Sequence, residues 1–277
     1  MEITLLWLSI IVLLISILGS ISGVGGGVLY VPLFLVFLND ELNEIKYIST
    51  FLVFLGSFMN VAIEIVKKRL NYKILLVGVV FSTISILIGN VISKSINSDA
   101  VIKIIVAVTL IIVTFMLIYS EYFLKVKDNS QKQYKLNKNF YIINKEGDKI
   151  NIILLSLISF IGGIITSLTG MGGGPIIMPL LIIIFSLKIS SAAPISHTLI
   201  MVSSFISLIL NPISMGYNPW VVKEIWVKNL VFAIPVILGF IAAIYLKKVI
   251  KKEIYIKWLL IIVIWISIIK IILDLIK

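Results

Sequence analysis

The chain has 277 residues, of which 60% are hydrophobic and only 13% charged, and its mean hydropathy is +1.16. A soluble domain is roughly half apolar and one quarter charged, so this composition excludes an ordinary soluble protein and indicates an all-α, multi-pass membrane protein. The net charge of +11 does not indicate nucleic-acid binding, because the lysines lie in loops between apolar segments, where they set topology and contact lipid headgroups. The absence of cysteine excludes disulfides and thiolate metal sites.

The first apolar run, residues 3–38, is too long for one straight crossing, which takes about 20 residues. Its centre carries Gly23-Val24-Gly25-Gly26-Gly27, followed by Pro32. Glycines in the middle of an apolar run indicate that the backbone breaks or comes very close to another group. We therefore expect a broken helical element here rather than a single transmembrane helix.

Three ordinary membrane spans are predicted next, followed by a hydrophilic, lysine-rich linker at 124–150 that we expect in the cytoplasm. The second half has the same layout of one interrupted apolar run and three spans. The predicted spans of the first half are 46–66, 73–93 and 101–123, and the second half comprises 151–187, 192–213, 222–246 and 254–276.

The interrupted run of the second half carries Gly170-Met171-Gly172-Gly173-Gly174 and then Pro179, at an offset of 147 residues from the first copy (170 minus 23). Ser49 and Ser196 keep the same offset in the spans that follow. The sequence thus predicts two homologous repeats, residues 1–123 and 151–277. Broken helices at matching positions in the two halves of a membrane protein indicate a transport site at the bilayer midplane.

The basic residues favour one of two topologies. If each glycine run crosses the membrane once, each repeat has four crossings and the repeats are parallel. If each run folds back as a hairpin of half-helices, or makes two short crossings, each repeat has an odd number of crossings and the repeats are inverted. The second arrangement places 17 of the 24 basic residues on one side, which the positive-inside rule prefers. We expect inverted repeats with both termini outside.

The glycine segments offer backbone amide donors. A helix is expected to begin just after each motif, with Pro175 at the first helical position of the second copy. The amides of Gly25–Gly27 and Gly172–Gly174 would then be unpaired and point into a cavity from the positive ends of two helix dipoles, which favours an anion. The alternative is that the glycines only allow close helix packing.

Hydroxyl, amide and imidazole side chains surround both motifs and recur along one face of the following spans, where they predict a polar lining for an oxyanion. Interhelical hydrogen bonding is the alternative for any single one of them. The predicted substrate-binding residues are Ser20, Ser22, Gly23, Gly25, Gly26, Gly27, Ser49, Thr50, Ser57, Asn60, Thr166, Ser167, Thr169, Gly170, Gly172, Gly173, Gly174, Ser196, His197, Thr198 and Ser204.

His197 is the only histidine and lies inside an apolar span, where it could add positive charge, shuttle a proton or act as a neutral hydrogen-bonding partner. Glu64 is expected to reach the interface from a span end. With no second histidine and no pair of intramembrane carboxylates, we predict no metal, no cofactor and no catalytic residues. The same shortage of buried carboxylates favours transport driven by the anion's own gradient over elaborate ion coupling.

The doubled pattern Ser-x-x-Gly-x-Gly-Gly-Gly-x-x-x-x-Pro-Leu, at Ser20 to Leu33 and Ser167 to Leu180, resembles the TauE/SafE family of sulfite and organosulfonate transporters over nearly the whole chain. The resemblance implies transport of sulfite, thiosulfate, sulfoacetate or organosulfonates across the cytoplasmic membrane of a prokaryote. The chain departs from the family pattern at His197, where a threonine is expected, and at Pro175, where an aliphatic residue or phenylalanine is expected.

Two function classes remain. The leading hypothesis is a secondary transporter that holds a small sulfur-containing anion at the midplane and exposes it alternately to either side as the two repeats move. The alternative is an anion channel that uses the same donors as a selectivity filter. An enzyme is not expected.

Overall fold

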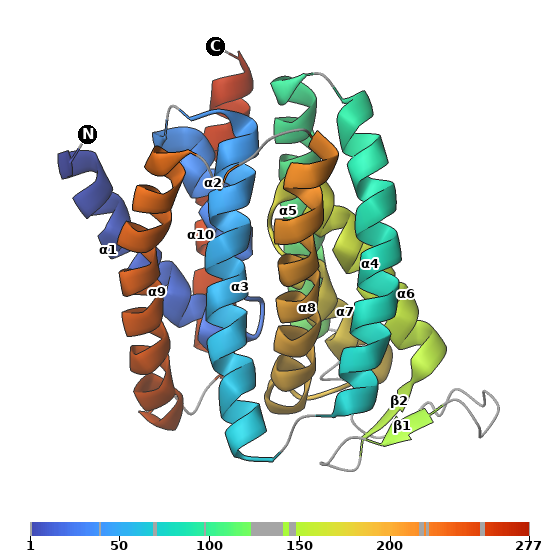
Figure 1. The fold of residues 1–277 in the computed structure, drawn as a ribbon. Coiled ribbons are helices and arrows are strands. Elements are labelled where there is room, and N and C mark those ends of the chain that lie inside the picture. Colours follow the sequence, from blue (N-terminus) through green and yellow to red (C-terminus); the bar gives the residue numbers. More distant parts are fainter. Residues whose placement is uncertain are drawn as a thin grey trace.

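The computed structural model describes residues 2–38, 40–68, 71–96, 98–122, 141–143, 148–215, 219, 222–249 and 253–276, so most of the predicted linker lies outside the described residues. Within these ranges the chain forms ten helices and one two-stranded hairpin (Figure 1). The first half contains α1 (Glu2–Ser22), α2 (Gly27–Phe37), α3 (Leu42–Val66), α4 (Tyr72–Ser95) and α5 (Asp99–Tyr122). The strands β1 (Tyr141–Ile143) and β2 (Lys149–Asn151) lead into α6 (Ile152–Thr169), α7 (Gly174–Phe185), α8 (Ile189–Met215), α9 (Lys223–Val249) and α10 (Glu253–Ile276).

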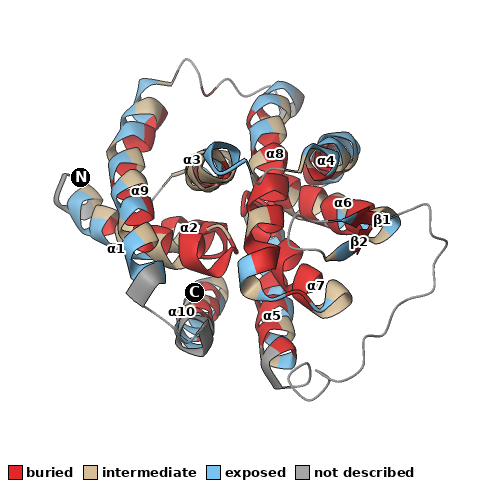
Figure 2. Cartoon of the chain, turned by 90° about the horizontal axis from the view of Figure 1, so that it is seen from below, coloured by how far each residue is buried: buried red, intermediate tan, exposed pale blue. Residues whose placement is uncertain are grey.

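Seven of the helices in the described part of the chain are long and apolar enough to span a membrane, namely α1, α3, α4, α5, α6, α8 and α9. The apolar helices α2 and α7, and the apolar segment 258–273 of α10, are shorter. Many large apolar side chains on the outer faces of the helices are exposed, for example Leu76 and Ile234, whereas buried residues gather toward the centre (Figure 2). An apolar exterior is what lipid requires. The predicted all-α, multi-pass membrane protein is confirmed.

Both glycine runs fold back on themselves. The helix α1 ends at Ser22 and α2 begins at Gly27, and in the second copy α6 ends at Thr169 and α7 begins at Gly174. In Figure 1, α1 and α2 form a hairpin whose outer ends lie at the top, near both chain termini, and α6 and α7 form one whose outer ends lie at the bottom, near β1 and β2. Each run thus folds back as a hairpin with unequal arms: α1 and α6 are long enough to span a membrane, whereas α2 and α7 are shorter.

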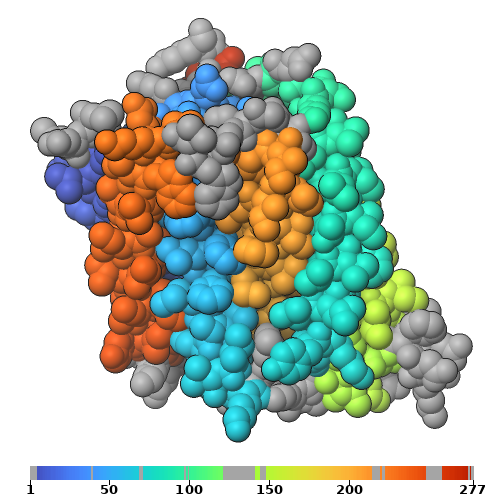
Figure 3. Space-filling model, in the orientation of Figure 1, coloured from blue at the N-terminus to red at the C-terminus, as the bar shows by residue number. Residues whose placement is uncertain are grey.

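We name the two ends of the molecule after these features: the terminus end, where α1 begins and α10 ends, and the linker end, which holds β1 and β2 (Figure 1). The equivalent helices α3 and α8 run in opposite directions between these ends and pack against each other, with the rings of Phe54 and Phe205 5.6 Å apart. The front face of the molecule shows α9, α3, α8 and α4 side by side (Figure 3).

The helices form two bundles that exchange elements between the halves of the chain. The first bundle contains α1, α2 and α3, against which α9 and α10 pack. The second bundle contains α6, α7 and α8, against which α4 and α5 pack. The contacts between α3 and α8, between α5 and α10 and between α2 and α7 join the bundles, and Figure 2 shows the two groups from below. The last two helices of each half therefore belong to the bundle of the other half.

One ion pair holds the first bundle together near the terminus end. The Lys228 ammonium in α9 lies 2.6 Å from the Asp40 carboxylate in the α2–α3 connection, and both side chains are largely buried. We expect Asp40→Asn to lower the stability by about 1–3 kcal/mol, because it leaves a charged donor without its charged acceptor. The measurement is the thermal midpoint in detergent. An unchanged midpoint would show that solvent replaces the carboxylate at no cost.

Candidate functional site

The two glycine turns have the same backbone conformation and touch each other at the centre of the molecule. Both helices that follow are preceded by a left-handed glycine, Gly26 with φ 56° and Gly173 with φ 70°. A Cβ atom at Gly27 would clash with the Met171 carbonyl oxygen, and one at Gly174 would clash with the Val24 carbonyl oxygen. Because 24 and 171 are equivalent positions, as are 27 and 174, the contact is reciprocal. The close packing that was the alternative interpretation of these glycines is thus present at Gly27 and Gly174.

Two of the six amides expected to be unpaired are already bonded within the first turn. The Gly25 amide donates to the Gly19 carbonyl over 3.2 Å, and the Gly27 amide donates to the Gly25 carbonyl. The prediction of a free donor is therefore wrong at these two positions, because the turn is tight enough to satisfy its own amides. In the second copy Pro175 is the second residue of α7 and not the first, as was predicted. Proline fits this position as well, because the amide groups in the first turn of a helix have no helical carbonyl to bind.

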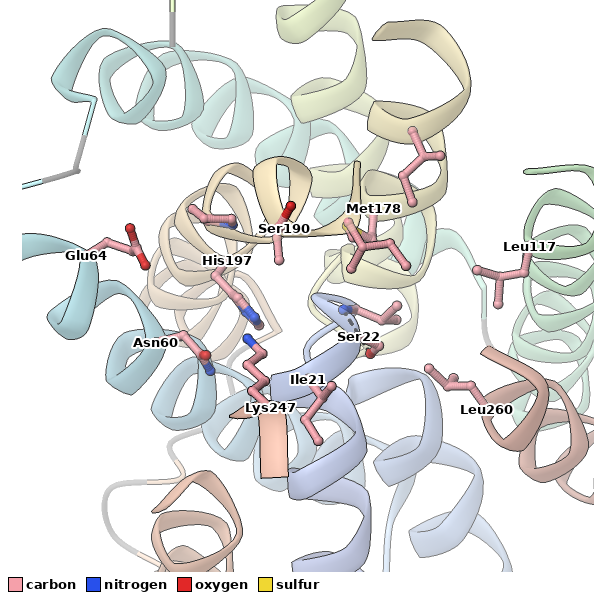
Figure 4. A pocket seen from close by; sticks show the side chains of 15 residues that line it. Ile21, Ser22, Asn60, Glu64, Leu117, Met178, Ser190, His197, Lys247 and Leu260 are labelled. Atoms are coloured by element: carbon pink, nitrogen blue, oxygen red, sulfur yellow. Dashed lines mark hydrogen bonds between the residues drawn. The ribbon is translucent and has the colours of Figure 1, made fainter. Parts of the chain in front are cut away.

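A cavity of about 310 Å³ opens beside the first glycine turn, between α3 and α8, toward the linker end (Figure 4). Three predicted site residues line it: Ser22 at the end of α1, Asn60 in α3 and His197 in α8. Its other lining residues are Ile21, Val24, Glu64, Leu117, Met178, Ile182, Ile189, Ser190, Ala193, Pro194, Lys247 and Leu260. The wall is thus apolar with a few polar groups on one side, as small-molecule sites are.

The polar side of this cavity carries one charge of each sign, the Lys247 ammonium of α9 and the Glu64 carboxylate of α3. Figure 4 shows the Lys247 ammonium of α9 pointing toward the His197 imidazole. His197 is buried, and neither ring nitrogen makes a hydrogen bond of good geometry within the described residues, although the Ser20 backbone lies close enough to interact with the ring. The Asn60 side-chain amide donates a hydrogen bond to the Ser20 hydroxyl over 3.3 Å, which joins α3 to the last turn of α1. An orphaned buried imidazole beside an ammonium is an arrangement that an anion would complete.

A second, much smaller pocket of about 20 Å³ lies between the same two helices at the terminus end. Thr50 is the predicted site residue that lines it, and its hydroxyl donates to the Gly170 carbonyl of the second glycine turn over 3.3 Å. The remaining lining residues are Asn43, Lys46, Tyr47, Ser207, Leu208, Asn211 and Pro212. A space of this size holds one water molecule at most.

Two equivalent hydroxyls face the glycine turns between the cavities. A Cβ atom at Gly25 would lie 3.5 Å from Ser57 Oγ, and one at Gly172 would lie 3.0 Å from Ser204 Oγ. Both hydroxyl groups are fully buried without a hydrogen-bond partner in the described part of the chain, as is that of Ser49. Buried hydroxyls are normally satisfied, so an unpaired pair beside two turns is where a bound ligand would be expected.

The remaining predicted hydroxyls are engaged in structural hydrogen bonds. Ser196 donates to the Gly23 carbonyl over 2.7 Å and so anchors α8 on the first turn. Ser167 donates to Asn90 of α4. Thr166, Thr169 and Thr198 donate to carbonyls one turn back in their own helices. The Thr169 hydroxyl also accepts from the Met171 amide, as that of Ser22 does from the Val24 amide. These side chains shape the turns, and only Ser22 among them lines a cavity.

The two charged residues that line the large cavity, Lys247 and Glu64, were not among the predicted site residues, nor was Lys46 of the small pocket. Lys247 lies one residue beyond the predicted span 222–246, whereas α9 continues to Val249 and brings its ammonium back over the cavity. Glu64 was expected at the interface, but it lines the same cavity together with Asn60, one helical turn away. An extension of the span 222–246 by one turn would have included Lys247. Glu64 already lies inside the predicted span 46–66, and its spacing of four residues from Asn60 would have placed it on the same helical face.

One of three comparisons with known proteins found a match. No curated protein and no solved structure matches the chain. The family model for the sulfite exporter TauE/SafE matches residues 8–271, which is nearly the whole chain and includes both glycine turns and both cavities. That family comprises membrane transporters of sulfite and related sulfur anions. The chain belongs to the TauE/SafE family.

Proposed function

We propose that the protein is a secondary transporter of the cytoplasmic membrane that carries sulfite, thiosulfate, sulfoacetate or an organosulfonate. The observation that carries this proposal is the 310 Å³ cavity, where a buried imidazole and an ammonium converge beside a glycine turn. An anion that enters from the linker end would meet Lys247 and His197 first. From there it would reach the unpaired Ser57 and Ser204 hydroxyls at the crossing of the two turns.

The proposed cycle exposes the anion alternately at the two ends of the molecule. The opposite directions of α3 and α8 support inverted repeats, because the two repeats then present equivalent surfaces to opposite sides. Since α9 and α10 pack with the first bundle and α4 and α5 with the second, the bodies that move are the two bundles rather than the two halves of the sequence. The basic residues of the loops favour a cytoplasmic position for the linker end.

The closed packing at the terminus end favours this cycle over a channel. The two described cavities differ in volume, about 310 against 20 Å³, and the reciprocal backbone contact of the glycine turns lies between them. A pore that conducts without alternating access needs a continuous path. A transport rate far above that of carriers, or single-channel currents from the reconstituted protein, would establish the channel instead.

Binding to detergent-purified protein tests the proposal. Sulfite or thiosulfate should raise the thermal midpoint, and Lys247→Met should weaken the apparent affinity by about tenfold, because it removes a charge-assisted contact. Lys67→Met is the matched control, since Lys67 is an exposed lysine at the linker end that does not line the cavity. Sulfate and chloride test selectivity.

These binding measurements test the identity of the anion and the location of its binding site separately. No stabilisation by any sulfur anion would refute the proposed cargo. Equal weakening by Lys67→Met and Lys247→Met would show that surface charge alone attracts the anion, and that the cavity does not bind it.

A further inference from the structure

The small pocket at the terminus end is built from the same positions as the large cavity at the linker end. Adding 147 to each of the four small-pocket residues on α3 gives a large-cavity residue, and subtracting 147 does so for two of the four on α8, Ser207 and Asn211. The pairs include Asn43 with Ser190, Lys46 with Ala193, Thr50 with His197, Ser207 with Asn60, and Asn211 with Glu64. Equivalent elements thus enclose both spaces, and the structure is open at the linker end and closed at the terminus end.

Each end has a lysine, but the two lysines stand at non-equivalent positions. Lys247 of the large cavity corresponds to Ala100, and Lys46 of the small pocket corresponds to Ala193. A side chain inherited from the duplicated ancestor would be expected at equivalent positions. The presence of one ammonium at either end therefore indicates that each cavity needs a positive charge for its own task.

Lys46 is the more deeply placed of the two. Its side chain is 4% exposed, within a membrane span, and its ammonium lies 3.4 Å from the Ser93 hydroxyl of α4. Burying an ammonium in a membrane protein is costly, and such residues mark ion and substrate pathways. The gap of about 20 Å³ beside Lys46 is the space that would widen if the bundles moved apart at this end.

The pocket is connected to the central crossing. The Thr50 hydroxyl donates to the Lys46 carbonyl over 2.7 Å and to the Gly170 carbonyl over 3.3 Å. A Cβ atom at Gly170 would lie 2.8 Å from Lys46 Cα, so this part of α3 rests directly on the second glycine turn. At the large cavity, a Cβ atom at Gly23 would lie 2.8 Å from Ala193 Cβ, so the equivalent part of α8 rests on the first glycine turn.

We infer that the pocket lined by Lys46, Thr50, Ser207 and Asn211 is a second anion-binding site, which takes the same small sulfur oxyanion when the terminus end opens. Lys46 is its charged residue. The inference rests on the proposed function, because it needs an anion that crosses the central turns. The anion passes from Lys247 at one end to Lys46 at the other, so each end offers it an ammonium group.

Lys46→Met tests the inference in two measurements on the full chain. Transport of radiolabelled sulfite into proteoliposomes should fall about tenfold or more, as expected for loss of one charge-assisted contact. Sulfite should still raise the thermal midpoint in detergent, because the linker-end cavity is unchanged. Lys46→Arg keeps the charge and should restore part of the transport.

Two control variants test whether Lys46 acts by binding the anion, by stabilising the fold, or only by adding positive charge to this end of the protein. Ser93→Ala removes the hydroxyl beside Lys46 but leaves the ammonium, and should transport sulfite at nearly the wild-type rate. Lys94→Met removes an exposed positive charge from the same end of α4 and should have no effect.

The possible results are distinct. Wild-type transport by Lys46→Met would overturn the inference, and so would loss of both transport and the sulfite-induced shift, since Lys46 would then have no role specific to the terminus end. If Ser93→Ala were as defective as Lys46→Met, Lys46 would act as a structural donor and the inference would fail. Absence of sulfite binding and transport in the wild type would instead refute the proposed function.

Discussion

The variant Gly174→Ala is expected to lose transport and to unfold at a clearly lower temperature than the wild type. The added Cβ atom would clash with the Val24 carbonyl oxygen of the other glycine turn and would lie 2.6 Å from Ile200 Cδ1. A backbone atom cannot move aside as the end of a side chain can, so the two turns must separate. Overpacking of this kind costs about 1–3 kcal/mol or more, and it falls where the two glycine turns touch each other.

The matched control is Gly56→Ala in α3. A Cβ atom there would have only Val236 Cγ1 within 4 Å, at 3.7 Å, which is an ordinary contact. Alanine is also favoured over glycine within a helix by about 0.5–1 kcal/mol. We expect Gly56→Ala to transport normally with an unchanged or higher thermal midpoint. Wild-type transport and stability in Gly174→Ala would show that the contact between the turns is not needed.

Two single-cysteine variants should differ widely in their reaction with a membrane-impermeant maleimide. The chain has no cysteine of its own, so each introduced thiol is the sole target. Asn60→Cys places it in the open cavity, and Ser207→Cys places it at the equivalent position of the closed pocket, where Ser207 is 1% exposed. A minor conformation is typically populated at 0.1–10%, so the Ser207→Cys thiol should react about 10 to 1,000 times more slowly.

The side of the membrane provides the control for this comparison. In vesicles of defined orientation, Asn60→Cys should react from the side that carries the linker, and Ser207→Cys, at its lower rate, from the opposite side. Equal rates would contradict the closed state of the terminus end. Labelling of both thiols from one side would contradict the opposite placement of the two pockets.

The sequence was sufficient for the features that depend on local chemistry. The repeated glycines fixed the positions of both turns, since no other residue tolerates the left-handed conformation at Gly26 and Gly173 so readily. The helical spacing of polar residues also placed Asn60 on the polar face of its span, and Asn60 lines the large cavity together with His197 of α8.

The features that the sequence did not predict depend on contacts between distant segments of the chain. Lys247 was assigned to a loop because hydropathy locates a helix end only to within a turn, and one turn decides whether a side chain faces solvent or a cavity. The hydroxyls of Ser167 and Ser196 looked alike in sequence, but one is bonded to α4 and the other to a glycine turn. Nor does any periodicity reveal that α9 packs on α1, because periodicity describes a helix face and not its partner.

The exchange of α4–α5 and α9–α10 between the bundles bears on how such a chain could have arisen. Each half of the sequence lacks the two helices that cover its own glycine hairpin, so a half expressed alone would leave that hairpin facing lipid. A single repeat of this layout could therefore cover its hairpin only by pairing with a second copy in the opposite orientation and exchanging its last two helices with it.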